Sequence, residues 1–294
     1  MTATILNGRE LAKTMRAEID EAVVKFRDKH GVTPTVAIVR AGKDPASVSY
    51  ANRIRRTTEK RGMGFSLHVL PETASQKAIV ELVRQLSADT GVHGIMVQEP
   101  LPKGIDEAAT KEALTPEKDV DGVHAVNAGR LAQVAPVGRP LGVLDYFLPA
   151  TPAGGLEILK RYNVEISGKN AVVVGRSNIV GKPMALLLLR ENATVTVAHS
   201  RTGDLAQVCR SADILCAAVG RSKIITADMI KPGTVVIDFG FNFDNEGNML
   251  GGDVDFEAVK EIAGMITPVP GGTGPMTNVM LMLNVLKAAR RQIE

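Results

Sequence analysis

Residues 171–189, AVVVGRSNIVGKPMALLLL, place a glycine-bearing loop between two apolar segments. The first segment is typical of a buried strand and the second of a helix, so we expect a strand, a tight turn and a helix in that order. The amino end of such a helix presents unpaired N–H groups and a partial positive charge, which favour a bound phosphate. Gly175 permits the tight turn, and Gly181 permits close approach of the backbone.

The loop departs from two common nucleotide-binding patterns. Ser177 stands at the second glycine position of G-x-G-x-x-G. Read as a P-loop, the segment has Arg176 at the first glycine and Pro183 at the Mg²⁺-binding hydroxyl, which excludes nucleoside-triphosphate hydrolysis. Taken alone, the loop fits a purely structural junction between strand and helix as well as it fits a nucleotide site.

The next expected strand ends in VAHSRT, residues 197–202. A dinucleotide fold that prefers NAD usually has an acidic residue near this point to bind the ribose 2′-hydroxyl. Ser200 and Arg201 stand there instead, and Arg176 lies in the first turn. A hydroxyl and two guanidinium groups suit a 2′-phosphate. Arg201 alone is better explained as a solvated loop residue, but the combination favours NADP over NAD.

Strand-like and helix-like segments alternate along the whole chain. Apolar or β-branched runs at 34–42, 65–70 and 94–98 are separated by amphipathic stretches. The same alternation of strand-like and helix-like segments continues after a Pro- and Gly-rich stretch around 135–155. This pattern predicts an α/β fold with parallel sheets covered by helices. We expect one domain over residues 1–145 and a second over 146–276, followed by a terminal helix over 277–294 with Thr277 as the candidate N-cap.

The composition narrows the class of protein. The chain has 294 residues, of which 45% are hydrophobic and 23% charged, as in soluble globular proteins. A net charge of +3, 3% aromatic residues and no Trp argue against nucleic acid as a partner. The only cysteines are Cys209 and Cys216, and they form no metal-binding pattern. With no signal peptide or membrane-length apolar run recognisable, we expect a cytoplasmic enzyme without metal or membrane attachment.

Several motifs together resemble one family. GRSNIVGKP, KDVDG followed by NAGRL, VQEPLP, GDVDF and TPVPGGTGPMT are similar to stretches of the bifunctional methylenetetrahydrofolate dehydrogenase/cyclohydrolase family, in the same order along the chain. The resemblance implies an N-terminal folate-binding catalytic domain and a Rossmann-type NADP domain, with the folate in a cleft between them. It also implies that the terminal helix packs back on the first domain, and that the protein is a homodimer.

The resemblance implies two reactions. The dehydrogenase moves a hydride from methylenetetrahydrofolate to NADP, and the cyclohydrolase adds water to the resulting methenyl compound to give 10-formyltetrahydrofolate. Tyr50, Gln98 and Asp121 match the family's residues on the substrate side, and Pro270, Gly271 and Gly272 lie in its signature. The residues expected on the cofactor side are Gly175, Arg176, Ser177, Ser200, Arg201 and Phe241. Without the resemblance, Tyr50 reads as a packing residue, Gln98 as a strand-end polar group and Asp121 as a turn residue.

One position departs from the family in a way that affects the chemistry. The family's lysine, four residues after its tyrosine, would fall at position 54, where this chain has Ile54. Hydrolysis of the methenyl group needs a proton-transfer residue, and isoleucine has no proton to exchange. Arg53 and Arg55 point about 100° to either side on a helix and cannot be deprotonated usefully. We therefore expect the cyclohydrolase activity to be lost or very weak, while hydride transfer survives.

A second departure is Glu99, which stands where the family usually has Leu. We expect its side chain to face away from the chemistry, exposed or in a salt bridge, unless an irregular strand end turns it toward the folate. Three alternatives to a dehydrogenase without cyclohydrolase activity stay open. They are a non-catalytic folate- or nucleotide-binding paralogue, an enzyme for another reduced pterin, and a fully bifunctional enzyme with a different proton-transfer group.

Overall fold

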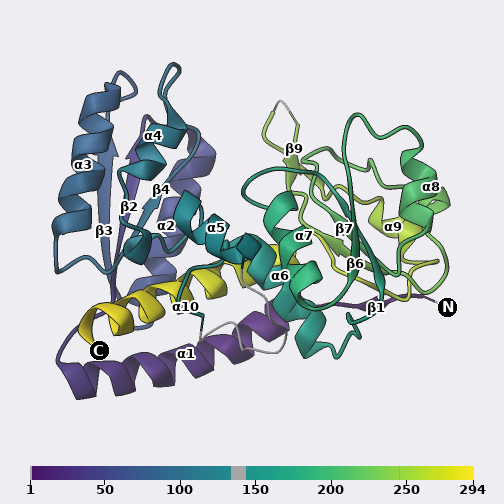
Figure 1. The fold of residues 1–294 in the computed structure, drawn as a ribbon, viewed down its shortest axis with the longest axis horizontal. Helices are drawn as coiled ribbons and strands as arrows, with labels where there is room; N and C mark the ends of the chain where they lie inside the picture. The colour runs from purple at the N-terminus through teal and green to yellow at the C-terminus, as the bar shows by residue number, and fades with distance from the viewer. Residues whose placement is uncertain (1, 134–143, 245) are drawn as a thin grey trace. The chain divides into compact units, whose positions relative to one another are not determined.

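A computed structural model describes residues 2–133, 144–244 and 246–294 (Figure 1). The described chain divides into two compact units. Unit 1 comprises residues 2–14, 131–133 and 151–280, and unit 2 comprises residues 15–130, 144–150 and 281–294. Two long helices, α1 (Gly8–His30) and α10 (Thr273–Ile293), contribute residues to both units.

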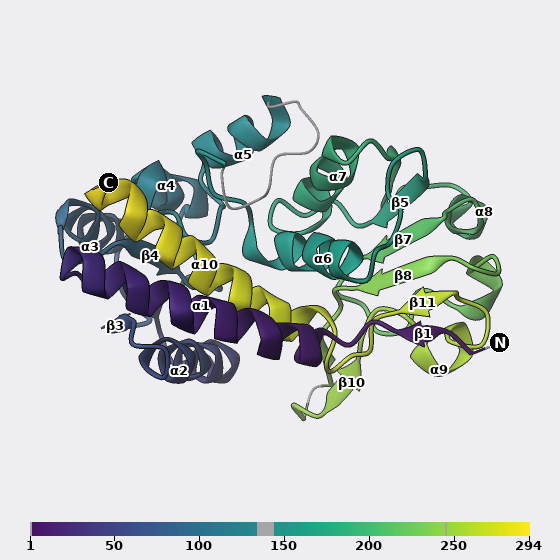
Figure 2. The same ribbon diagram turned by 90° about the horizontal axis from the view of Figure 1, so that it is seen from below.

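The main sheet of unit 1 has six parallel strands. Its order is β1-β11-β8-β7-β5-β6, and Figure 2 shows β8, β11 and β1 in adjacent rows. The bounds of these strands are β1 (Thr4–Ile5), β5 (Asn170–Val174), β6 (Thr194–Ala198), β7 (Ile214–Ala217), β8 (Val235–Asp238) and β11 (Met265–Ile266). The central strands are apolar and buried because both faces of the sheet are covered, as their sequences predict.

Short helices connect these strands. α7 (Gly181–Arg190) follows β5 and packs against β5 and β6. A core that includes Cys209 and Val259 joins α8 (Leu205–Arg210) and α9 (Phe256–Val259) to the sheet. The other elements of unit 1 are α6 (Ala150–Arg161), the 3₁₀ turn η3 (Ala227–Met229) and the hairpin of β9 (Asn242–Phe243) with β10 (Met249–Gly251).

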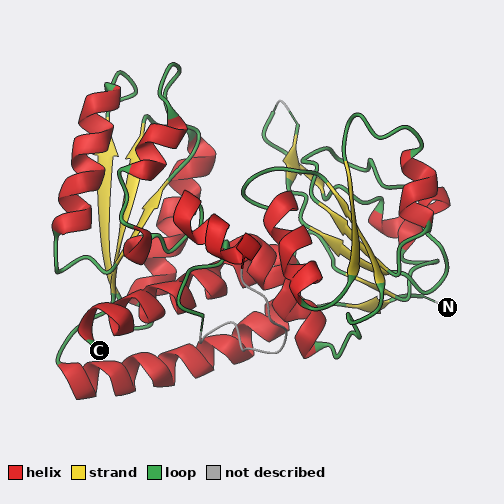
Figure 3. Cartoon of the chain, in the orientation of Figure 1, coloured by secondary structure: helices red, strands yellow, loops and turns green. Residues whose placement is uncertain are grey.

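Unit 2 is built on a three-stranded parallel sheet in the order β3-β2-β4 (Figure 3). The strands are β2 (Thr35–Ala41), β3 (Gly64–Leu70) and β4 (Gly94–Val97). The helices are α2 (Pro45–Glu59), α3 (Gln76–Ala88), α4 (Glu107–Glu112) and α5 (Ala125–Gln133), with a 3₁₀ turn η1 (Pro116–Lys118). Asp44, Ser75 and Asp106 cap α2, α3 and α4 by accepting hydrogen bonds from first-turn N–H groups.

The element boundaries differ from the predicted ones at both ends of the chain. Thr4 and Ile5 pair with β11, which places residues 2–14 in unit 1 although the predicted first domain begins at residue 1. α10 begins at Thr273, so Thr277 lies inside the helix and is not its N-cap. Pro275 does not prevent this early start, because an N–H in the first turn has no partner within the helix. Residues 134–143, within the predicted Pro- and Gly-rich boundary, lie outside the described residues.

Within the described ranges, no helix is both long enough and apolar enough to cross a membrane. The same ranges contain no group of three or more His, Cys, Asp or Glu side chains that could hold a metal ion.

Candidate functional site

The sheet of unit 2 has a point at which its strand order reverses. From the central strand β2 the chain passes to β3 on one side and then to β4 on the other, so the crevice outside the carboxyl ends of β2 and β4 is the expected ligand position. Ser47, in the first turn of α2, and Gln98, just after β4, meet at these ends. The Gln98 Nε2 atom donates to the Ser47 carbonyl at 3.2 Å.

Gln98 is buried, with 5% of its surface exposed. Because its Nε2 atom is committed to a carbonyl acceptor, the orientation of the amide is fixed and Oε1 must accept from another donor. Among the described residues, Oε1 has no hydrogen-bond partner. A buried acceptor without a partner is costly, so this atom calls for an explanation.

The segment that carries Asp121 runs beside β4. Ile95 of β4 forms a parallel bridge with Asp119, and Asp119 is anchored by N–H groups of Val123 and His124 and by the Asn127 amide at 2.8–3.1 Å. This anchoring fixes the backbone on either side of Asp121.

Asp121 itself is half-buried. Burial, followed by the negative charges of Asp119 and Glu99, raises the pKa of Asp121 to about 7, while Lys111 opposes the rise. Burial and the charge of Asp121 raise the pKa of Tyr50, so its hydroxyl keeps its proton at neutral pH. Tyr50 and Asp121 are therefore electrostatically coupled. At neutral pH the Tyr50 hydroxyl can donate a hydrogen bond and the Asp121 carboxyl group can accept one.

Ile54 lies on the buried side of α2. Its side chain is 2% exposed and shares a helical face with Ser47, Ala51 and Thr58, which are also buried. Tyr50 is half-buried on the adjacent stripe. Position 54 therefore continues the face whose first turn contacts Gln98.

Glu99 forms an ion pair with Lys111 of α4 at 2.6 Å, which confirms the salt-bridged prediction. Its negative charge is among the causes that raise the pKa of Asp121. The regular alternation of a strand does not apply here, because β4 ends at Val97 and Glu99 lies beyond it.

The loop after β5 in unit 1 forms a backbone cradle. A Cβ on Gly175, at φ +122°, would lie 2.1 Å from the Ala218 carbonyl oxygen, and one on Gly181 would lie 2.3 Å from the Gly175 oxygen. β5 and β7, which precede Gly175 and Ala218, are neighbours at the point where the strand order of this sheet reverses. Ser177 Oγ accepts from the N–H groups of Val180 and Gly181 at 3.2 and 3.3 Å, which ties the loop to the start of α7.

A buried carboxylate shapes the neighbouring loop after β7. The side chain of Asp253, which is fully buried, accepts hydrogen bonds from the N–H groups of Val219, Gly220 and Arg221 at 2.6–2.9 Å. The Asn242 amide donates to the same carboxylate at 3.0 Å. Asp253 therefore fixes the backbone that directly follows Ala218, the residue against which Gly175 packs.

The other residues predicted on the cofactor side are exposed. Arg176 and Ser177 lie in the cradle loop, and Ser200 and Arg201 lie in the turn after β6. That turn is held by a hydrogen bond from the Arg201 N–H to His199 Nδ1 at 3.1 Å. Phe241 is 52% exposed, and its ring meets that of Phe243 edge-on with centroids 4.9 Å apart.

The predicted substrate-side residues divide between the two units. Tyr50, Gln98 and Asp121 belong to unit 2, whereas residues 270–272 belong to unit 1. The 270–272 segment packs against the start of α1, since the Arg9 N–H donates to the Gly271 carbonyl at 3.0 Å. A Cβ on Gly8 would lie 1.9 Å from the Gly272 oxygen, so this contact requires glycine at position 8.

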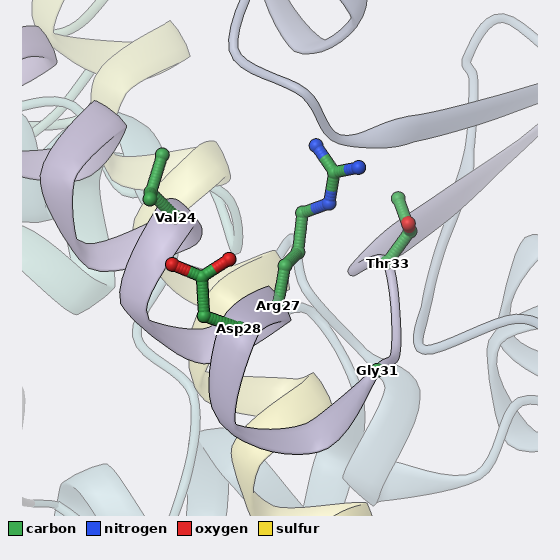
Figure 4. Close-up of a pocket in the computed structure, with 5 residues that line it drawn as sticks. All are labelled: Val24, Arg27, Asp28, Gly31 and Thr33. Atoms are coloured by element: carbon green, nitrogen blue, oxygen red, sulfur yellow. The ribbon is translucent and has the colours of Figure 1, made fainter.

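A separate pocket lies at the end of α1 (Figure 4). It is lined by Val24, Arg27, Asp28, Gly31 and Thr33 and shares no residue with the groups above. One guanidinium and one carboxylate on its wall do not form a catalytic arrangement.

Known proteins cover the whole of this chain. The tetrahydrofolate dehydrogenase/cyclohydrolase catalytic domain matches residues 6–121, and the NAD(P)-binding domain of the same family matches residues 149–293. The bifunctional protein FolD of Roseiflexus sp. is 52% identical over 293 residues, which span 100% of this chain and 98% of the relative. The chain belongs to the tetrahydrofolate dehydrogenase/cyclohydrolase family.

Solved structures of the family have the same fold. The FolD enzyme of Campylobacter jejuni aligns with a TM-score of 0.92 and 39% identity over 98% of this chain and 99% of its own. The Trypanosoma brucei enzyme, solved with NADP and an inhibitor, aligns with a TM-score of 0.92 and 34% identity over 100% and 99%. The predicted fold, an α/β catalytic domain with a Rossmann-type nucleotide domain, is confirmed.

The cradle of unit 1 fits the dinucleotide that the family's second domain binds. A Cβ at Gly175 or Gly181 would meet backbone atoms, which is the close packing that a pyrophosphate-binding turn requires. Arg176, Ser200 and Arg201 are exposed at the carboxyl ends of β5 and β6, where an adenosine ribose is expected. The cradle and these side chains provide N–H donors and positive charge for the phosphates.

Sequence reasoning missed three residues that organise these sites. Asp119 and Asp253 lie within the motifs KDVDG and GDVDF, but neither motif indicates which backbone N–H groups its carboxylates accept from. The role of Lys111 as the partner of Glu99 could not be predicted, because α4 carries no recognisable motif. No local signal in the sequence pairs it with Glu99.

Proposed function

We propose that this protein oxidises 5,10-methylenetetrahydrofolate to 5,10-methenyltetrahydrofolate with NADP, and that its cyclohydrolase activity is lost or very weak. The family supports the dehydrogenase reaction. The observation that carries the second part is Ile54, an apolar residue buried on the face of α2 whose first turn contacts Gln98. The orphaned Oε1 atom of Gln98 supports the same conclusion, because it is what a missing cationic partner would leave behind.

The side chains of unit 2 suit the binding of a reduced pterin. An ionised Asp121 accepts two N–H donors from the aminopyrimidinone edge, which fixes the ring in one orientation. Tyr50 keeps its proton and offers its ring face and hydroxyl. NADP, when bound, supplies the hydride acceptor. The protein's share of the dehydrogenase reaction is then positioning, which needs no proton-transfer residue at position 54.

Hydrolysis of the methenyl group needs proton transfers that these residues do not provide. The attacking water must lose a proton, and the departing nitrogen must gain one. Tyr50 is a poor base because its raised pKa keeps it protonated, and Asp121 is engaged by the pterin in this arrangement. The product of the protein is therefore methenyltetrahydrofolate, which it releases.

One assay tests both parts of this function. Methylenetetrahydrofolate and NADP are mixed with the protein, and formation of NADPH and decay of the methenyl product are followed together. We expect NADPH to form and the methenyl compound to decay at the rate without enzyme. Firm NADP binding by calorimetry with no turnover indicates a non-catalytic paralogue, and fast enzymatic decay indicates a bifunctional enzyme. Either outcome overturns the proposal in the corresponding part.

The preference for NADP depends on the cations near Ser200. Arg176→Gln and Arg201→Gln are each expected to raise KM for NADP about 10- to 100-fold, the usual effect of losing a charge-assisted hydrogen bond, while KM for NAD changes little. Lys169→Gln is the matched control, because Lys169 precedes β5 at the other end of the sheet. Equal changes for the two nucleotides contradict the assignment. The distinction matters within the family, since a Saccharomyces cerevisiae structure at 25% identity and TM-score 0.81 is described as NAD-dependent.

The homodimer implied by the resemblance also belongs to this proposal. β3 is an edge strand of its sheet, and Leu67 and Val69 on one of its faces are 39% and 50% exposed. Apolar side chains on an exposed edge favour pairing with another chain. Light scattering is expected to give twice the chain mass for the protein and the single-chain mass for a Leu67→Lys, Val69→Lys double variant. A monomeric unmodified protein contradicts the dimer.

A further inference from the structure

The terminal helix α10 contacts the segment that carries Asp121. Asn284 of α10 is buried, with 8% of its surface exposed, although its side chain is polar. Its Nδ2 atom donates to the backbone carbonyl of Val120 at 2.8 Å and to that of Leu148 at 3.1 Å. One side-chain amide therefore joins two backbone segments that are far apart in the chain.

The carbonyl of Val120 belongs to the peptide unit that leads into Asp121. A peptide unit is planar, so a hydrogen bond to its oxygen restricts the direction in which the backbone enters Asp121. The other side of Asp121 is held by packing. Gly122 has φ +70°, and a Cβ there would lie 2.4 Å from the carbonyl carbon of Leu148. The second carbonyl that Asn284 binds is therefore the one against which Gly122 packs.

Asp121 lies in a tight turn, since the Gly122 N–H donates to the Asp119 carbonyl at 3.2 Å. The Asp119 carboxylate accepts from the Asn127 amide at 2.8 Å, and the Asn127 oxygen accepts from the Phe147 N–H at 3.2 Å. Phe147 is adjacent in sequence to the second residue that α10 binds. The turn is therefore joined to this segment twice, and both connections are made by buried amides.

The helix that carries Asn284 is itself fixed against the same segment. Lys287, three residues further along α10, donates from Nζ to the Tyr146 carbonyl at 2.7 Å. Residues three apart share a helical face, so Asn284 and Lys287 follow this segment together. Leu281 and Val285, which lie near Asn284 on the helix, are buried. The Asn284 amide is therefore held by packing as well as by its hydrogen bonds.

We propose that Asn284 is a positioning residue for Asp121, because it holds the backbone from which this carboxylate receives the N–H donors of a reduced pterin. The inference rests on the proposed function, which assigns the pterin to Asp121. Two hydrogen bonds to one planar edge require the carboxylate to lie in a narrow range of positions and angles. Asn284, separated from Val120 by 164 positions, thus contributes to folate binding through Asp121.

Asn284→Ala tests this role in the full-length protein. The substitution removes the donor that the carbonyls of Val120 and Leu148 share, so the turn can move and Asp121 loses its orientation. We expect kcat/KM for methylenetetrahydrofolate to fall about 10- to 100-fold, mainly through KM, since small displacements of a binding group have effects of this size. KM for NADP should change little, because the cradle residues belong to unit 1.

Gln292→Ala is the matched control. Gln292 lies on the same helix, and its Nε2 atom also donates to a backbone carbonyl of unit 2, that of His93, at 2.8 Å. His93 precedes β4, whereas Gln98 and the candidate site lie beyond the other end of this strand. Both variants should lower the melting temperature, but Asn284→Ala alone should lower kcat/KM for the folate. Equal kinetic losses in the two variants, or unchanged folate kinetics in folded Asn284→Ala, overturn the proposal.

A double-mutant cycle determines whether Asn284 acts through Asp121. In the Asp121→Asn background the orientation of this side chain matters less, so the loss caused by Asn284→Ala should shrink to about 2-fold or less. An equal loss in both backgrounds means that Asn284 acts elsewhere and overturns the proposal. If the alanine variant does not fold, Asn284→Ser, which keeps one donor, takes its place in the cycle, with a smaller loss of the same kind expected.

A measurement without ligand separates this inference from the proposed function. Hydrogen exchange is followed in a peptide covering residues 119–124, whose N–H groups form hydrogen bonds within the turn. Exchange should become faster in Asn284→Ala and stay unchanged in Gln292→Ala. If it does so while Asp121→Asn leaves the folate kinetics unchanged, Asn284 orders the turn and the pterin assignment is wrong. If exchange stays unchanged in Asn284→Ala, this residue does not position the turn.

Discussion

Ile54→Lys is expected to raise the cyclohydrolase rate about 10²- to 10⁴-fold above that of the unmodified protein. This is the usual contribution of a general acid–base residue. The new ammonium would replace a side chain that is 2% exposed, so burial should lower its pKa toward the range in which it exchanges protons. Dehydrogenase activity should remain measurable, because hydride transfer depends on positioning.

The geometry of α2 supports this gain. Helical side chains point toward the amino end of the helix, and residues seven apart lie on the same face. A lysine at position 54 would therefore extend toward Ser47, whose carbonyl accepts from Gln98 Nε2 at 3.2 Å. The unpartnered Oε1 of Gln98 is an acceptor for the ammonium. One substitution thus supplies a proton-transfer residue and a partner for a buried acceptor.

Ile54→Met is the matched control, since it is apolar and unbranched like the lysine stem but has no proton to exchange. Both variants are compared with the unmodified protein by the decay of methenyltetrahydrofolate and by circular dichroism. Ile54→Lys should lower the melting temperature, because a charge is introduced into the core. A folded Ile54→Lys variant that retains the dehydrogenase reaction but does not hydrolyse the methenyl compound contradicts the proposed role of position 54.

The fold was predictable where short segments carry their own signal. The apolar runs at β2, β5 and β7 and the helices between them predict parallel sheets, because strands that alternate with helices and are buried on both faces are typical of such sheets. The pairing of Thr4 with Met265 was not predictable. β1 has only two residues and thus no periodicity, and its partner lies at the far end of the chain.

The site was predictable to the same extent. The loop from Gly175 to Gly181 could be recognised because a strand, a turn and a helix are contiguous in sequence. The roles of Asp253 and Lys111 depend on partners that the fold brings from elsewhere, such as the N–H groups of residues 219–221 and the carboxylate of Glu99. The sequence predicted a salt bridge for Glu99 but could not name its partner, because Lys111 lies on α4, beyond the end of β4 at Val97.

Asp121→Asn is expected to lower kcat/KM for methylenetetrahydrofolate about 10²- to 10³-fold. The amide can accept only one of the two pterin donors that a carboxylate accepts, and it lacks the charge that strengthens both bonds. KM for NADP should change little, because the cradle residues belong to unit 1. Glu107→Gln is the control, because Glu107 is an acidic residue on α4 whose ion pair is with Lys111. Asn127→Ala is avoided, because it would remove a hydrogen bond from Asp119. Unchanged folate kinetics in Asp121→Asn contradict the assignment of the pterin.

The same variant should be more stable than the unmodified protein at alkaline pH. The folded-state pKa of Asp121, about 7, exceeds the ordinary value near 3.9 in an unfolded chain. The folded state therefore holds this proton more tightly, and the resulting stabilisation is complete below about pH 4 and lost as the pH rises through about 7. Asparagine carries no charge at any pH and avoids this loss.

Thermal unfolding at pH 5 and pH 8 checks this sign. At pH 8 we expect Asp121→Asn to gain on the order of 1 kcal/mol, after allowance for solvent around a half-buried group. The gain should shrink at pH 5, where Asp121 is mostly protonated in the folded state. An equal or lower melting temperature at pH 8 contradicts the raised pKa. A residue whose replacement weakens catalysis but stabilises the fold is retained for its ligand, because its charge opposes folding and favours binding.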